Sequence, residues 1–186
     1  MGITFWKNQL RYIRKAWSLK TQGLERLQSK HMTDEVDMIQ KYAFDLAQRF
    51  VGTDEVNGSV DNPQIMAMLK LDNSWPSNDE VPWCSAFANY ICWLARLPRS
   101  KDLRARSWLA IGKGISLDQA EAGDIVVFKR GSGDQPGPEV LDAPGHVGFY
   151  AGRISGFIEV LGGNQGNQVK ISRYPESSLL GVRRLT

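Results

Sequence analysis

Two residues in the chain, Cys84 and His146, have the types and positions suited to nucleophilic catalysis. Cys84 follows Pro82 and Trp83 where a polar loop is predicted to become a helix. A thiol at a helix N-terminus lies at the positive end of the helix dipole, which favours the nucleophilic thiolate. Free cysteine is also common in protein cores, so Cys84 alone does not distinguish a reactive thiol from a structural one.

His146 is one of only two histidines, and it opens an apolar stretch directly after Pro144 and Gly145. An imidazole at the start of a strand, beside glycine, can face an open cleft. There it could take the proton of a thiol and later protonate a leaving amine. The alternative is a polar residue whose hydrogen bonds are satisfied locally.

Asn164 is the candidate for a third member of such a site. It follows the predicted strand 156–161 and shares a strand face with Ile158 and Val160, so its amide could fix the tautomer of the imidazole. Glu159 is the competitor, but it lies on the opposite face. Turn geometry would explain the Gly-Gly-Asn run equally well.

The second cysteine, Cys92, lies eight residues after Cys84 in the same predicted helix. That spacing separates the two Cα atoms by about 12 Å, too far for a disulfide. Two free thiols are typical of a protein made in a reducing compartment.

Hydrophobic periodicity predicts helices first and strands afterwards. Helices are expected over 33–51, from Pro63, from the cysteine to about residue 97, and around 105–111. Strands are expected near 122–128, 146–150, 156–161, 168–174 and 180–185, with a Gly/Pro-rich loop at 131–144. Helices that precede strands without alternation predict an α+β fold with an antiparallel sheet.

Residues 1–32 differ in charge from the rest of the chain. Residues 1–31 carry seven Lys and Arg against one acid, whereas the remainder has more acids than bases. Trp6, Leu10, Ile13 and Trp17 recur at helical spacing, which predicts a cationic amphipathic helix. It could contact an anionic membrane or lipopolysaccharide, pack on its own domain, or be an artificial extension that ends near His31.

The net charge of +3 and its distribution do not favour a nucleic-acid partner. No stretch approaches the roughly 20 apolar residues that span a bilayer, and no secretion leader is recognisable. We therefore expect a monomer made in the cytoplasm, with residues 33–186 as one catalytic-sized domain.

Five blocks of the sequence, in order, resemble a cysteine peptidase family of the CHAP and NlpC/P60 type, found in phage lysins and bacterial wall-active proteins. The blocks are PWCSAF (82–87), ARSW (105–108), GDIVVF (123–128), GHVGFY (145–150) and LGGNQ (161–165). The resemblance covers about residues 33–186 and implies a papain-like fold that cleaves amide bonds in peptidoglycan.

Carried over by position, the resemblance implies Cys84 as nucleophile, His146 as base and Asn164 as orienting residue. Many CHAP domains have a glutamate where this chain has Gly162. The residues proposed to contact substrate are Asp79, Trp83, Trp108 and Gln165, although the tryptophans would fit a core equally well.

No cofactor is implied, and the acidic loop 72–80 is interpreted as a solvated turn because it lacks the spacing of a calcium loop. The function expected is a peptidoglycan amidase or endopeptidase, a lysin or delivered effector, that acts in the periplasm or outside the cell. The alternatives are an inactive wall-binding module and a membrane-active protein that acts through residues 1–31.

Overall fold

The structure, a computed structural model, describes residues 38, 40–56 and 60–185. The predicted amphipathic helix and its membrane contact lie outside these residues. Within the unit Ile39–Thr186, residues 40–48 are helical, and two further α-helices follow, α2 (Pro63–Leu69) and α3 (Cys84–Leu94). In the described part of the chain, no helix is long and apolar enough to cross a membrane.

Helix α2 begins at Pro63, where the sequence predicted a helix. Pro63 occupies the first turn, where its missing N–H costs nothing, and the Asn62 side chain accepts a hydrogen bond from the Gln64 amide at 2.9 Å. The predicted helix near residue 105 is instead a 3₁₀ helix, η1 (Ala105–Ala110).

Six antiparallel strands form one sheet with the order β1-β6-β2-β3-β4-β5. Their bounds are β1 Lys113–Ile115, β2 Ile125–Lys129, β3 Gly145–Ile154, β4 Phe157–Gly162, β5 Lys170–Pro175 and β6 Leu179–Arg184. Helices followed by an antiparallel sheet confirm the predicted α+β class. Strand β1 was not predicted, because three residues are too short to show a period.

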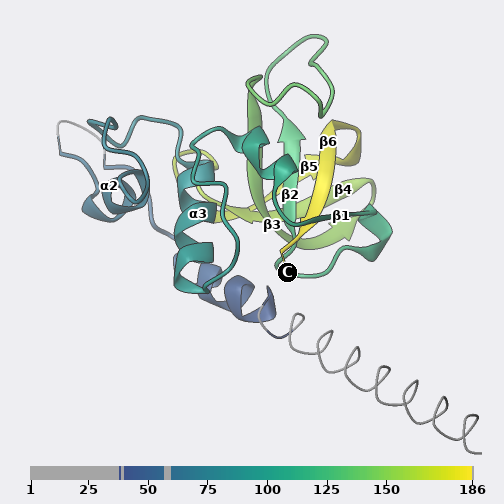
Figure 1. The fold of residues 1–186 in the computed structure, drawn as a ribbon, viewed down its shortest axis with the longest axis horizontal. Helices are drawn as coiled ribbons and strands as arrows, with labels where there is room; N and C mark the ends of the chain where they lie inside the picture. The colour runs from purple at the N-terminus through teal and green to yellow at the C-terminus, as the bar shows by residue number, and fades with distance from the viewer. Residues whose placement is uncertain (1–37, 39, 57–59, 186) are drawn as a thin grey trace, which may run out of the picture. The chain divides into compact units, whose positions relative to one another are not determined.

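The main core lies between α3 and the sheet (Figure 1). Phe87 of α3 packs edge to face against Phe149 of β3, with ring centroids 6.2 Å apart. A smaller cluster, which includes Val126, Phe128 and Val160, is buried separately. The first residues of α3 and β3 are therefore held by the main core of the protein.

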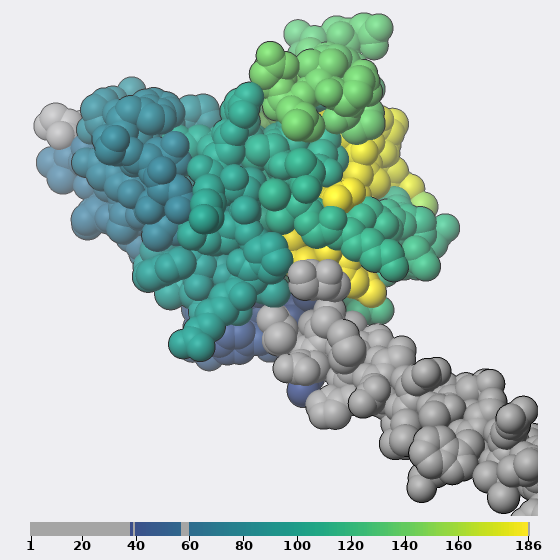
Figure 2. Space-filling model, in the orientation of Figure 1, coloured from purple at the N-terminus to yellow at the C-terminus, as the bar shows by residue number. Residues whose placement is uncertain are grey.

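The loop 131–144 leads into β3 and projects as a separate lobe in Figure 2, where it is light green. Arg106 of η1 holds the part of this loop that lies nearest the sheet. Its buried guanidinium donates through Nη1 to the carbonyl oxygens of Gly137 and Val140 at 2.8 and 3.1 Å, and through Nε to that of Pro144 at 2.9 Å. Arg106 thereby fixes the chain directly before His146.

Candidate active site

Cys84 is the first residue of α3, as predicted, and its side chain is only 2% exposed. The backbone amides of Ser85, of Cys84 itself and of Val147 in β3 face the sulfur and act to lower the pKa of the thiol. Burial has the larger effect, so the pKa of Cys84 is raised above its ordinary value. The start of the helix therefore acts on the thiol in the expected direction, but burial outweighs it and favours the neutral thiol over the thiolate.

His146 is the second residue of β3, adjacent to the Val147 amide that faces Cys84. It is 3% exposed, and burial lowers the pKa of its imidazole to about 4, partly opposed by its hydrogen bond to Gln165. Its ring stacks on that of Tyr174, with centroids 4.9 Å apart and an angle of 15° between the planes. At neutral pH the imidazole is therefore uncharged and held in a fixed plane.

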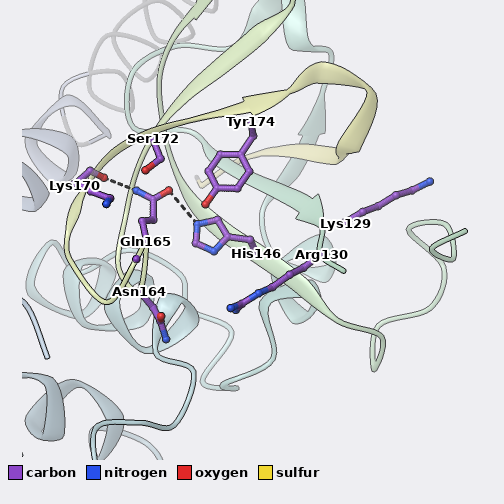
Figure 3. Close-up of a pocket in the computed structure, with 9 residues that line it drawn as sticks. Lys129, Arg130, His146, Asn164, Gln165, Lys170, Ser172 and Tyr174 are labelled. Atoms are coloured by element: carbon purple, nitrogen blue, oxygen red, sulfur yellow. Dashed lines mark hydrogen bonds between the residues drawn. The ribbon is translucent and has the colours of Figure 1, made fainter. Parts of the chain in front are cut away.

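Gln165 fixes the tautomer of this imidazole. Its side-chain nitrogen donates to the carbonyl oxygens of Val160, Gly162 and Lys170, which leaves its Oε1 to face His146 Nε2 at 3.2 Å (Figure 3). Because Oε1 only accepts, Nε2 must carry the proton. The lone pair of the neutral ring is then on Nδ1, the nitrogen that remains to act as a base.

Asn164, the predicted orienting residue, has no hydrogen bond to His146. Strand β4 ends at Gly162, and Asn164 adopts a left-handed backbone conformation with φ of 53°, so strand alternation does not extend to it. Its side chain lines the pocket beside His146 instead (Figure 3). The side chain that contacts the imidazole is that of Gln165, which the sequence placed only among substrate-contacting residues.

Gly162 ends β4 and Gly163 follows it, and both lie close to residues of the site. A Cβ at Gly163 would lie 2.5 Å from the Trp83 ring, so only glycine lets this turn approach the start of α3 so closely. A Cβ at Gly162 would lie 3.4 Å from His146 Nε2 and 3.3 Å from Gln165 Cδ. Gly162, the last residue of β4, therefore lies directly against the imidazole and the Gln165 side chain.

All four residues expected to contact substrate are buried in the structure, and of these Gln165 lines the pocket beside His146 whereas the other three do not. Trp83 and Trp108 are both 0% exposed and donate through Nε1 to Glu55 Oε1 at 2.7 Å and to Ser85 Oγ at 2.9 Å. Asp79 is 4% exposed and accepts a hydrogen bond from the Asn62 amide at 2.8 Å. These side chains position the surrounding chain and do not line the cleft, which corrects the sequence-based interpretation.

Cys84 and His146 line two adjoining pockets. The cleft beside Cys84 is mainly apolar, and its walls include Trp75, which is 64% exposed, and Leu103. The pocket beside His146 is polar, and Arg130 lines both pockets. Sequence reasoning missed Trp75 and Arg130, because an exposed Trp in a loop and an Arg after a strand carry no motif.

Within the described residues, no hydrogen bond joins the Cys84 thiol to His146. In sites without substrate such contacts are often long, and they tighten in the complex. The same residues contain no group of three or more His, Cys, Asp or Glu placed to hold a metal ion. The arrangement supplies a buried thiol, a neutral base with a fixed tautomer, and an adjoining cleft.

Solved structures with a similar fold are NlpC/P60 proteins. NlpC1 from Trichomonas vaginalis is 15% identical, aligned over 79% of this chain and 44% of that one, with a TM-score of 0.47. The P60 domain of an antigen from M. avium subspecies paratuberculosis is 16% identical, aligned over 81% of this chain and 96% of the domain, with a TM-score of 0.48. This chain thus spans less than half the length of NlpC1.

A lipoprotein-like member of the NLP/P60 family from Staphylococcus aureus is 20% identical, aligned over 80% of this chain and 42% of that one, with a TM-score of 0.44. No protein-family model matches the chain, and no curated protein matches it.

The geometry predicts that Gln165 matters more to turnover than its neighbour Asn164. Gln165→Met keeps the length of the side chain but removes the acceptor for Nε2–H, so kcat should fall about 10- to 100-fold with little change in KM. Asn164→Ala is the matched control and should stay within about threefold, since it removes no contact to the imidazole.

Nitrogen NMR of the imidazole distinguishes a role of Gln165 in orienting His146 from a general loss of structure in the variant. The wild type should show the Nε2–H tautomer, and the Gln165→Met protein a mixture of tautomers in a folded chain. Equal losses of kcat in the two variants would contradict the orienting role of Gln165.

Proposed function

We propose that the chain is a cysteine hydrolase that cleaves an amide bond of peptidoglycan. One observation carries the proposal: Cys84 begins α3 against the Val147 amide, and the adjacent His146 has its Nε2–H committed to Gln165. The free Nδ1 is the base that a neutral thiol requires.

The mechanism follows from these protonation states. As substrate enters, the Cys84 thiol gives its proton to His146 Nδ1 while the sulfur attacks the amide carbonyl carbon. The backbone N–H of Cys84, at the open end of the helix, is placed to donate to the developing oxyanion. The imidazolium then protonates the leaving amine, and water, deprotonated by His146, hydrolyses the thioester to a carboxylate and the free thiol.

The substrate class rests on the sequence blocks around these residues. The nucleophile, base and LGGNQ blocks resemble wall-active cysteine peptidases. The contact of Gln165 with His146, and the Val147 amide that faces Cys84, support the proposal. The amide cleaved is therefore expected in the stem peptide or cross-link, by an amidase or an endopeptidase.

Digestion of purified peptidoglycan tests this function. The wild type should release soluble fragments, and mass spectrometry should find one class of new amino and carboxyl termini with intact glycan strands. Cleavage of glycan bonds, or no new termini at any enzyme concentration, would contradict the proposal.

A second function is favoured by one observation, namely that the thiol is neutral and has no hydrogen bond to His146. A wall-binding module without turnover would have the same features. In that case the wild type would co-sediment with peptidoglycan and leave it uncut, and Cys84→Ala would bind equally well.

A further inference from the structure

Arg130 is the residue where the two pockets of the site meet. It follows directly after β2, it is exposed, and it lines both the Cys84 cleft and the His146 pocket. In Figure 3 its side chain extends toward the side of the pocket where Asn164 lies, whereas that of Lys129 extends away. A ligand that reaches Cys84 and His146 must therefore pass close to the guanidinium.

Arg130 has no carboxylate partner among the described residues, and in this respect it differs from Arg104. Arg104, which lines the same cleft, is bound to Asp102 with Nη2 and Oδ2 2.6 Å apart. Arg106 is buried, and its Nε and Nη1 donate to carbonyl groups of the loop. The planar guanidinium of Arg130 thus keeps its donors free, in the geometry that binds a carboxylate with two hydrogen bonds.

The pocket around Arg130 is built for a negative charge. It encloses about 290 Å³, and no aspartate or glutamate lines it. Lys170 and Ser172 add a cation and a hydroxyl to the same walls. The Cys84 cleft on the other side of Arg130 is mainly apolar, although Arg104 and Asp142 also lie on its walls.

An unpaired Arg130 also works against the chemistry of the site. Its charge lowers the pKa of His146 further, and it therefore disfavours the imidazolium that must protonate the leaving amine. An anionic group of the substrate, bound to the guanidinium, would cancel this effect when the reaction needs it. The Arg130 guanidinium therefore ceases to disfavour the imidazolium only when an anionic ligand is bound to it.

We propose that Arg130 binds a free carboxylate of the peptide substrate, next to the amide that Cys84 attacks. This inference rests on the proposed function. It assigns the site a substrate class, acidic stem peptides with an unmodified carboxylate, and predicts that amidation of this carboxylate protects the wall.

Binding of two synthetic stem peptides tests Arg130 without relying on turnover. One peptide carries free side carboxylates, and the other carries the same groups as carboxamides. In the Cys84→Ala background, titration calorimetry should give about 10- to 100-fold tighter binding of the acid form. Arg130→Met should reduce this ratio to near one, whereas Lys113→Met, which removes an exposed charge on β1, should leave it unchanged.

Turnover of the same peptides by proteins with Cys84 intact separates the two claims. Binding that prefers the acid form, without cleavage of either peptide, would overturn the proposed function and support the role of Arg130. Cleavage of both peptides at equal rates, or a preference for the acid form that survives in Arg130→Met, would overturn the role of Arg130 alone. Failure of both peptides to bind would also overturn the role of Arg130.

Discussion

Replacing Cys84 with alanine is expected to lower the rate of peptidoglycan cleavage by at least about 10⁴-fold, because it removes the proposed nucleophile and the other cysteine, Cys92, lies two turns further along α3. The substitution removes one sulfur from a packed site, so the fold should persist with a loss of about 1 kcal/mol or less in the free energy of unfolding. Release of soluble fragments from purified walls measures the first effect, and thermal unfolding measures the second.

Cys92 provides the matched control for this experiment. It lies two turns further along α3, is 0% exposed, and has its pKa raised by burial. Cys92→Ala should cost similar stability and leave the cleavage rate within about threefold. Undiminished cleavage by Cys84→Ala, or equal losses in the two variants, would remove Cys84 as the nucleophile.

Replacing His146 with glutamine is expected to lower kcat by about 10²- to 10⁴-fold, the contribution usual for a general base. Glutamine preserves a donor toward Gln165 but has no basic nitrogen. The pH profile identifies the base more specifically than the loss of rate. Burial lowers the pKa of His146 to about 4, so the base form is present above this pH and is lost as the pH falls through it.

The acid limb of kcat/KM for the wild type should therefore lie near pH 4 rather than near pH 6.5, the value for an ordinary imidazole. The residual activity of His146→Gln should show no limb in this range. An acid limb near 6.5 in the wild type would mean that the imidazole is solvated during catalysis. A limb retained in the variant would assign it to another group.

The elements that carry the site could be predicted from local sequence. Pro82 before the cysteine and Gly145 before the histidine mark the ends of loops, and apolar periodicity follows each of them. The structure confirms that α3 begins at Cys84, and β3 begins at Gly145, one residue before the histidine. These features depend on residues within a few positions of one another, which is why sequence alone was sufficient.

The third member of the site could not be predicted in this way. Counting by strand alternation led to Asn164, but the left-handed conformation after Gly162 turns the chain and gives the place beside His146 to Gln165. The three backbone carbonyls that hold the Gln165 amide come from β4 and β5, and their meeting depends on sheet register.

The burial of the site residues, and its effect on the pKa of Cys84, also could not be predicted from the sequence. Trp83 resembles a cleft residue because it precedes the cysteine, yet it packs against the glycine turn and bonds Glu55. The field of the helix N-terminus was a correct expectation, but the desolvation of a thiol that is 2% exposed outweighs it. Both outcomes depend on how α3, β3 and the turn after β4 pack together.

Mass spectrometry of the protein during turnover tests the central claim most directly. Acid quenching in the presence of an acidic stem peptide should trap a thioester on the peptide that contains Cys84, and peptide mapping should assign the added mass to Cys84 and none to Cys92. The adduct should be absent from Cys84→Ala. Cleavage of the substrate with no adduct on Cys84 under any quench time, or an adduct on Cys92, would contradict the account.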